Sequence, residues 1–495
     1  MQRRASAFTL WALIFALVIS GDFFGWNFGL DAGGFGGMLV ATVLVLILYS
    51  GLSFCIAEMS PTMPHTGGAY SFARSAMGPW GGFSTGVAET IEYVVASSVV
   101  VVGIGGYMGT IINDLFDVSL SQPLWWAIFY LLFVLLNVAG VEIALKFAVA
   151  ITFVTIGVLA VFWVGALPHF DLDNALMAAS EDGQPQWFPV GVDGVFFALP
   201  FAAWFLLGVE SVPLVAEESH EPKRDIPRAI VLALVTLAIA AFLTLFLSSG
   251  MAPGGAVVGT SAEPLGEGFK TIFGAGTAVS VLSLLAVVGL VASFHGVIFA
   301  YGRNIFSLSR AGYYPHFFSL THGRRHTPYI ALIVGSVVGY ALAYLLYEVG
   351  TGQVAAALLS MAVFGAVVSY VAQAAAFIIL RRKMPHVERP FRSPFGITGA
   401  VVTMVLTIMM LVAIFWNADY RPGVVGMLVF YLVAVAYFAL VGRKRLVLSP
   451  EEEFALTRGE HGHPETEGYG VTERELFRPG EAAETTTSTG PQPDS

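Results

Sequence analysis

Charged residues are scarce in this sequence. They make up 12% of its 495 residues, against 56% hydrophobic residues and a mean hydropathy of +0.76, whereas a soluble domain carries about 25% charged residues. This shortage excludes an ordinary soluble protein and indicates a polytopic membrane protein. The single cysteine, Cys55, excludes an intrachain disulfide and a cysteine-based metal cluster.

Motifs for covalent chemistry are missing as well. The apolar runs show no His/Asp metal cluster and no Ser/His or paired-Asp constellation, so we expect no enzymatic activity, no resident metal and no cofactor. No glycine loop of the nucleotide-binding type is present, which argues against a pump driven by ATP. We also expect no nucleic-acid partner.

What the sequence has in abundance is long apolar runs. A run of about 20 apolar residues crosses the hydrocarbon core of a membrane as a helix. Twelve such runs predict an all-α polytopic membrane protein with twelve transmembrane helices. They cover approximately residues 8–33, 37–57, 81–110, 122–141, 144–167, 193–216, 227–250, 276–308, 328–347, 355–380, 398–417 and 423–442.

The distribution of Lys and Arg predicts the orientation of these helices. With both termini inside, nearly all basic residues fall on the inner side, and the outer side collects only Lys270 and Arg421. Because basic loops stay in the cytoplasm, we expect a multi-pass plasma-membrane protein, surrounded by lipid, with both termini cytoplasmic. After residue 446 the chain is polar and acidic, which predicts a disordered, solvated tail.

Two of the runs are interrupted near mid-membrane. In the first, ISGDFFGWNFGLDAGG (19–34), Gly21 and Asp22 follow an apolar stretch that is too short to span. In the sixth, FFALPFAAWFLLGVESVPLVAEE, Gly208 and Glu210 fall in mid-span. Matched interruptions at the head of two inverted halves are typical of a transporter with a site near the membrane midplane.

The interruptions therefore predict a 5+5 inverted repeat, since five helices per half invert the second half. The alternative is that the glycines only permit close helix packing. The predicted organisation is a cytoplasmic N-terminus (1–7), a first repeat (8–167), an extracellular loop (168–192), a second repeat (193–381), helices 11 and 12 (382–445) and the acidic tail (446–495).

Three stretches resemble the amino acid–polyamine–organocation (APC) superfamily of secondary transporters. They are PHTGGAYSFARSAMGPWGGFSTG (64–86), EESHEPKRDIPRAI (217–230) and SRAGYYPHFF (309–318). The resemblance implies a LeuT-like fold with broken helices 1 and 6, two additional C-terminal helices and transport by alternating access. Within the superfamily, GDFFGWNFGL, GPWGGFSTG, FAAWFLLGVES and EPKRDIPR look like the ethanolamine permease branch, which implies import of ethanolamine or a similar small primary amine.

The residues of the first interruption favour an amine over an amino acid. Relatives that carry amino acids bind the substrate carboxylate on backbone N–H groups of a small, glycine-rich break. Here Asp22 would repel a carboxylate and attract an ammonium group, and Phe23, Phe24 and Trp26 fill the space. The expected substrate-binding residues are Gly21, Asp22, Gly25, Trp26, Glu92, Trp204, Gly208 and Glu210.

Coupling to an ion, H⁺ or Na⁺, stays open at this stage. Glu89 and Glu92 lie three residues apart and share a helix face, and Glu89 is either a coupling residue or solvated near the cytoplasmic end. His295 is either a proton carrier or a structural histidine satisfied by a neighbour. The fifth run has a lysine only at its start, Lys146, which departs from relatives that are thought to use an interior lysine for coupling.

The segment EESHEPKRDIPR predicts a cytoplasmic gate in which acids and bases pair in one conformation. Its members are Glu217, Glu218, Arg224 and Arg228. Alternatives to the amine transporter are a permease or exchanger for neutral or cationic amino acids, a channel, and a transport-derived sensor. The sequence does not predict the oligomeric state.

Overall fold

The computed structural model describes residues 5–63, 67–180, 183–274, 277–321, 327–349, 354–418, 420–447, 449, 452 and 455. This part of the chain is helical, and its one β-bridge is isolated and joins Ala5 to Ser219. The prediction of an all-α membrane protein is confirmed.

Ten of the described helices are long and apolar enough to cross a membrane. They are α3 (Phe28–Met59), α4 (Gly68–Phe116), α5 (Gln122–Ala139), α6 (Val141–Ala166), α9 (Pro222–Gly250), α12 (Thr277–Arg310), α13 (Tyr329–Val349), α14 (Val354–Lys383), α15 (Gly396–Trp416) and α16 (Arg421–Leu440).

Two broken segments complete the twelve predicted spans. The first comprises α1 (Ala7–Val18), the single turn α2 (Ser20–Phe23) and the start of α3, and the second comprises α8 (Asp193–Ala203) and the 3₁₀ helix η2 (Val209–Glu218). The remaining short helices connect the spans. They are η1 (Leu167–His169), α7 (Leu172–Leu176), α10 (Gly255–Thr260), α11 (Pro264–Phe273), η3 (His316–Ser319) and η4 (Gly442–Arg445).

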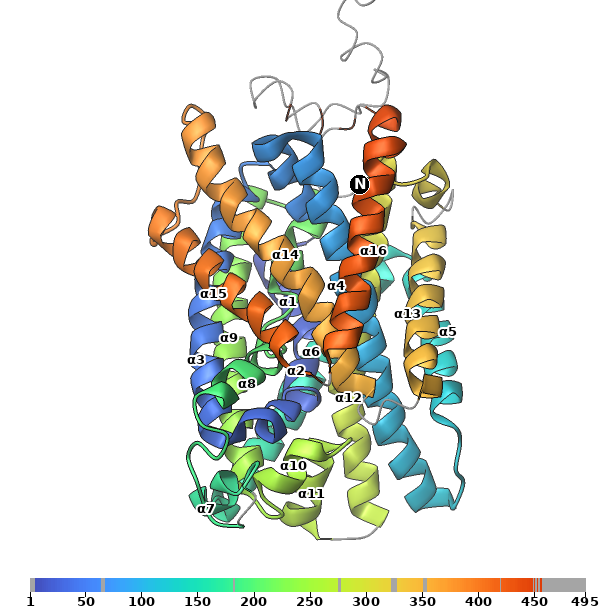
Figure 1. Ribbon diagram of the computed structural model, residues 1–495. Helices are drawn as coiled ribbons and strands as arrows, with labels where there is room; N and C mark the ends of the chain where they lie inside the picture. Colours follow the sequence, from blue (N-terminus) through green and yellow to red (C-terminus); the bar gives the residue numbers. More distant parts are fainter. Residues whose placement is uncertain are drawn as a thin grey trace, which may run out of the picture.

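The helices form one bundle (Figure 1), and the burial of their side chains divides them into a buried centre and an apolar outer ring. In α4, α12 and α14 the most apolar windows are 72%, 78% and 83% buried, whereas in α5 and α16 the values are 28% and 11%. The exposed residues of the outer helices are large and apolar, for example Leu131 and Val433, which is the pattern of a lipid-facing surface. The short helices α7, α10 and α11 cover the lower end of the bundle in Figure 1.

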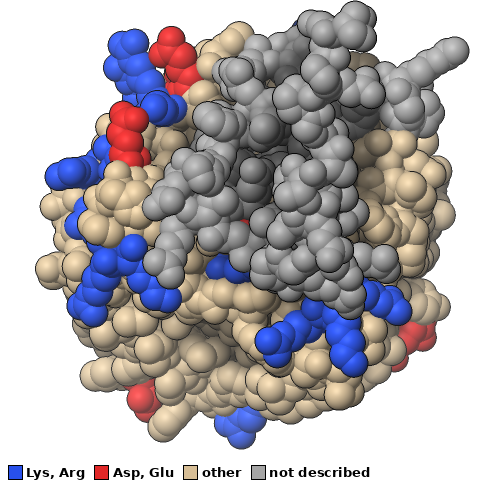
Figure 2. Space-filling model, turned by 90° about the horizontal axis from the view of Figure 1, so that it is seen from above, with Lys and Arg blue, Asp and Glu red and all other residues tan. Residues whose placement is uncertain are grey.

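The opposite end of the bundle is basic. It carries the start of α9 and the ends of α12, α14 and α16, where Lys and Arg residues gather, and Figure 2 views the molecule from this side. We call it the basic end, and it is the end that the sequence predicts to be cytoplasmic.

The first broken segment is interrupted three residues later than the sequence predicts. Gly21 and Asp22 lie in the helical turn α2, and the break falls at Phe24, which is extended, and at Gly25, which has a φ of 98°. Gly21 is needed for close approach, because a Cβ atom there would lie 2.3 Å from the carbonyl oxygen of Trp204. The predicted break at Gly21 and Asp22 is therefore wrong in position.

The second broken segment has its break at Trp204 to Gly208. Gly208 has a φ of 108°, which side chains rarely allow. A Cβ atom at Gly208 would lie 2.2 Å from Leu17 Cδ2 in α1. The two broken segments thus cross at backbone distance, and each contributes a glycine to the contact. The inverted relation between the two halves remains a prediction.

We expect Gly21→Ala to destabilise the fold, because its Cβ atom would meet backbone atoms of Trp204 and Phe205 that cannot rotate away. Overpacking of this kind costs about 1–3 kcal/mol. Gly157→Ala in α6 is the matched control, because nothing lies within 4 Å of its Cβ position. Thermal unfolding of the detergent-purified variants should show a lower melting temperature for Gly21→Ala alone. Equal melting temperatures would contradict the backbone contact.

Candidate functional site

Asp22 is the polar residue at the end of the first half-helix. Its side chain is fully buried, and neither carboxyl oxygen makes a regular hydrogen bond to a described residue. Thr244 of α9 lies beside the carboxyl group, and its hydroxyl, which accepts a hydrogen bond from Trp163 Nε1 at 3.2 Å, keeps its O–H to direct at Asp22. A buried carboxyl group with open acceptor positions is unusual, and it is available to a ligand that donates hydrogen bonds.

At the first break, the free backbone N–H group forms a hydrogen bond to a side chain of the protein itself. The N–H group of Gly25 donates to Asn27 Oδ1 at 3.0 Å. The amide nitrogen of Asn27 donates in turn to the carbonyl oxygens of Val258 and Ser261, at 2.9 and 3.0 Å. Asn27 therefore holds the break open and ties it to the segment around α10, a role that the sequence analysis missed.

Aromatic rings cover the crossing of the two broken segments. The Trp26 ring stacks on Phe205 with a centroid distance of 5.5 Å, and the Trp204 ring lies 2.8 Å from the position of a Cβ atom on Gly25. Both indoles are buried, and neither Nε1 has a hydrogen-bond partner among the described residues. The crossing therefore offers aromatic ring faces and two indole N–H groups that have no acceptor among the described residues.

Two further acids meet on the other broken segment. The Tyr370 hydroxyl of α14 lies 3.1 Å from Glu92 Oε1 and 3.0 Å from Glu210 Oε2. The Tyr370 hydroxyl thus bridges the two carboxyl groups. A buried pair of neighbouring carboxyl groups is more stable with one proton between them than with two negative charges.

The acid pair is held by groups from three elements. The N–H of Gly208 donates to Glu210 Oε2 at 3.1 Å, so the second break also has its glycine amide occupied by the chain itself. Tyr93 lies 3.4 Å from Glu210 Oε1, and the Tyr49 and Tyr370 hydroxyls lie 3.0 Å apart. Sequence reasoning found both acids but neither Tyr370 nor Tyr49, since 160 and 278 residues separate Tyr370 from its two acids.

Glu89 is fully buried, so the alternative that it is solvated is wrong. Asn304 Nδ2 donates to Glu89 Oε2 at 3.2 Å, and Asn304 Oδ1 accepts from Thr90 at 2.7 Å. Oε1 of Glu89 makes no regular hydrogen bond to a described residue. Glu89 lies near Glu210 and belongs to the basic-end side of the acid cluster.

His295 lies apart from the acids and is satisfied by its neighbours. Its Nδ1 is 3.1 Å from Asn137 Nδ2, and its Nε2 is 3.1 Å from the carbonyl oxygen of Ala144. The amide nitrogen of Asn137 can only donate and the carbonyl of Ala144 can only accept, so the ring is neutral with the proton on Nε2. The structural alternative for His295 fits this geometry.

The predicted gate is only partly described. Arg224 and Arg228 are exposed at the basic end, while the side chains of Glu217 and Glu218 lie outside the described residues. Pairing within this gate therefore stays a prediction.

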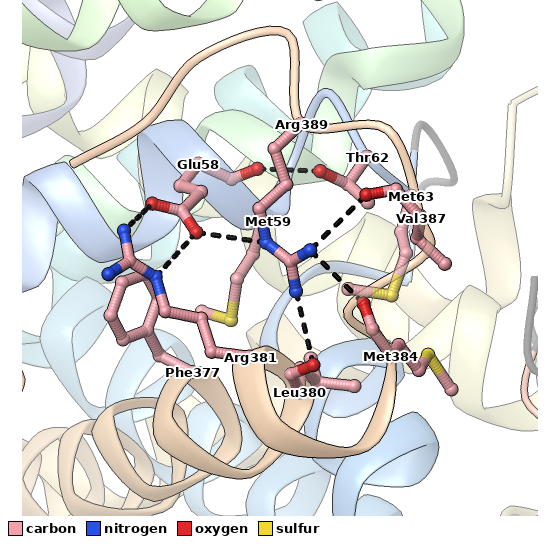
Figure 3. Close-up of a pocket in the computed structure, with 10 residues that line it drawn as sticks. All are labelled: Glu58, Met59, Thr62, Met63, Phe377, Leu380, Arg381, Met384, Val387 and Arg389. Carbon is pink, nitrogen blue, oxygen red and sulfur yellow. Dashed lines mark hydrogen bonds and ion pairs between the residues drawn. The ribbon is translucent and has the colours of Figure 1, made fainter. Parts of the chain in front are cut away.

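A different ionic cluster joins the ends of α3 and α14 at the basic end (Figure 3). Glu58 at the end of α3 accepts from Arg381 Nε at 2.8 Å, from Arg389 Nε at 3.0 Å and from the backbone N–H of Ser393 at 2.8 Å. Glu58, Arg381 and Arg389 line a small pocket with Met59, Thr62, Phe377 and Leu380. The cluster joins residues more than 300 positions apart, so no local pattern predicts it.

The geometry brings most of the predicted site residues together. Gly21, Gly25, Trp26, Trp204 and Gly208 meet at the crossing, and Glu92 meets Glu210. Within the described part of the chain Asp22 makes no regular hydrogen bond to either acid, and it lies beside α9 instead. Within the same residues no group of three or more His, Cys, Asp or Glu side chains is arranged to hold a metal ion.

A membrane bundle in which two broken helices cross at a buried polar site is the architecture of a secondary transporter. Residues 6–440 match the amino acid permease family. The chain belongs to this family of the APC superfamily, so the resemblance to the superfamily is confirmed.

Three relatives cover nearly the whole chain. An uncharacterized transporter of Rhizobium meliloti is 28% identical over 87% of this chain and 90% of its own. The branched-chain amino acid permease of Bacillus subtilis is 26% identical and the methylthioribose transporter of the same organism is 24% identical, each over 91% of this chain and 95% of its own.

We expect Glu58→Gln to destabilise the protein, since it leaves two partly buried guanidinium groups without their carboxylate. Removing one partner of a buried ion pair costs about 3–5 kcal/mol. The matched control is Glu388→Gln, whose ion pair with Lys223 is exposed, where the expected loss is about 0–1 kcal/mol. Unfolding in detergent measures both, and a Glu58→Gln variant as stable as the control would contradict the role of the cluster.

Proposed function

We propose that the protein is a secondary active transporter that imports ethanolamine or a similar small primary amine. The observation that supports this proposal is that a backbone N–H group at each of the two breaks is already hydrogen-bonded to a side chain. The glycine amides that would receive a substrate carboxylate are bonded to Asn27 Oδ1 at Gly25 and to Glu210 Oε2 at Gly208. A carboxylate would have to displace both side chains.

The charges around the crossing support the same substrate class. Asp22, Glu92 and Glu210 are buried, and none of them forms an ion pair with a Lys, Arg or His within the described residues. One ammonium and one carboxylate about 4 Å apart attract by roughly 4 kcal/mol at an effective dielectric constant near 20, before desolvation. A substrate carboxylate would be repelled by a similar amount.

The proposed binding mode uses the groups that lack partners. The ammonium of the amine donates to the open oxygens of Asp22 and lies near the faces of Trp26 and Trp204, and a desolvated cation–π contact contributes about 2 kcal/mol. The indole Nε1 groups then donate to the hydroxyl of an aminoalcohol. Gly21, Gly25 and Gly208 let the two broken segments approach closely at this crossing.

We propose the proton as the coupling ion. Tyr370 and Glu92 belong to the continuous helices α14 and α4, whereas Glu210 belongs to the broken segment. Loss of the shared proton would place two charges side by side and push η2 away from its partners. The protonation state of this pair would thus select between two positions of the broken helix, which is what alternating access requires. Sodium coupling is the alternative.

The second candidate function is an amino acid permease. It is favoured by the relative from Bacillus subtilis named as a branched-chain amino acid permease and by the family itself. This function would require the Asn27 and Glu210 side chains to leave the glycine amides when substrate binds. In either case we propose the plasma membrane as the location, with the basic end in the cytoplasm.

Uptake of radiolabelled ethanolamine into proteoliposomes tests the amine proposal. We expect saturable uptake that alanine, arginine and putrescine do not block, and that Asp22→Asn lowers at least about tenfold, since a charge-assisted hydrogen bond contributes about 1.5–3 kcal/mol. Asp31→Asn is the matched control, because Asp31 is exposed at the end of the same segment.

Competition by alanine together with an active Asp22→Asn variant would contradict the proposal and support the amino acid permease.

The Tyr370→Phe variant tests the proposal that the proton is the coupling ion. Removing the hydroxyl leaves the acid pair without its shared donor, so we expect uptake driven by an inward proton gradient to fall about tenfold, while counterflow, which needs no net proton movement, is retained. Tyr344→Phe on an exposed face of α13 is the control. Uptake that depends on a sodium gradient and is unchanged in Tyr370→Phe would overturn proton coupling.

A further inference from the structure

The chain beyond α16 does not leave the bundle at residue 446, as the prediction of a solvated tail requires. The N–H of Val447 donates to the carbonyl oxygen of Ala311 at 3.1 Å. Leu446 is buried, and a Cβ atom on the neighbouring Gly312 would lie 2.1 Å from the carbonyl oxygen of Arg445. The start of the tail is therefore docked on the turn that follows α12, and the prediction is wrong for these residues.

Further along, Glu452 is inserted into the basic end of the bundle. Its side chain is fully buried. Oε2 accepts from Arg74 Nε at 2.6 Å and from Arg74 Nη2 at 2.5 Å, and Oε1 accepts from the Tyr313 hydroxyl at 2.7 Å. Ser449, between the two docked points, is buried as well. We call Arg445, Leu446, Val447, Ser449 and Glu452 the tail contact.

Arg74 has its counter-charge in the tail contact. Its side chain is only 6% exposed, and it forms an ion pair with Glu452. A buried guanidinium without a counter-charge is strongly unfavourable. Arg74 therefore cannot stay in place if Glu452 leaves, and its segment must move or admit water.

The segment that carries Arg74 links the tail contact to the candidate site. It is residues 68–77 of α4, bounded by Gly68 with a φ of 57° and Gly78 with a φ of 79°. A Cβ atom on Gly68 would lie 3.0 Å from Leu214 of η2 and 4.0 Å from Glu89 Oε1. The segment thus packs on the broken helix itself, just on the basic-end side of the acid cluster.

We propose that the tail contact is an autoinhibitory latch. By pairing Glu452 with Arg74 it holds residues 68–77 against η2, and this keeps the site closed towards the basic end. The family match covers residues 6–440, so Arg74 lies within the matched region whereas Glu452 and the rest of the tail contact lie beyond it. The latch would act in the same way whether the substrate is an amine or an amino acid.

Cysteine labelling tests the latch without reference to any substrate. Cys55 is buried and is the one cysteine of the chain, so Cys55→Ala gives a silent background. In the full-length protein, Ser449→Cys reports undocking of the tail and Ser211→Cys in η2 reports opening of the site, each through its rate of reaction with a maleimide. Both positions are buried in the latched protein.

We expect Glu452→Gln to raise both labelling rates at least tenfold and Glu388→Gln, an exposed acid at the same end, to change neither. The charge exchange Arg74→Glu with Glu452→Arg should restore slow labelling, which separates the latch from a general loss of folding. Faster labelling at 449 with no change at 211 would show that the tail is only an anchor. Unchanged labelling at both positions would contradict the claim that the Glu452–Arg74 ion pair holds the tail in place. Failure of ethanolamine uptake would leave these results unaffected.

Discussion

The structure depends on one contact, the crossing of two broken helices at backbone distance. Gly21 lies against the carbonyl of Trp204, and Gly208 lies against Leu17. Breaking a helix inside a membrane frees N–H and C=O groups that lipid cannot satisfy. Here Asn27 Oδ1 and Glu210 Oε2 accept hydrogen bonds from the freed N–H groups of Gly25 and Gly208. The breaks can therefore exist before any substrate is bound, and the polar groups that remain without partners define what the site is able to bind.

The acids divide into two sets with different surroundings, and the proposed function gives each set a different task. Asp22 lies on the α9 side of the crossing, beside Thr244, with oxygens that make no regular hydrogen bond to a described residue. Glu92 and Glu210 share the Tyr370 hydroxyl on the other side. Sequence analysis assigns Asp22, Glu92 and Glu210 together to substrate binding. Under the proposed function, the separation gives the amine and the proton different positions, so that one can be bound while the other is exchanged.

Much of the fold could be predicted from the sequence, but less of the site. Apolar runs and membrane acids are local signals, and they predicted the twelve spans and the burial of Glu92 and Glu210. The break was misplaced because a glycine serves equally well for a left-handed turn, as at Gly25, and for a close approach, as at Gly21, and the sequence does not distinguish these uses. Tyr370 and the partners of Glu58 could not be predicted, since only the folded bundle brings residues so distant together.

The central claim is that the crossing binds an ammonium group and excludes a carboxylate. It is tested most directly by equilibrium binding of radiolabelled ethanolamine to the purified protein, with L-alaninol and L-alanine as competitors that differ only in a hydroxymethyl or a carboxylate group. The account predicts that alaninol displaces ethanolamine and that alanine does not, even at a large excess. Displacement by alanine at the same concentration as alaninol would contradict it, and would show that the glycine amides at the breaks are open to a carboxylate after all.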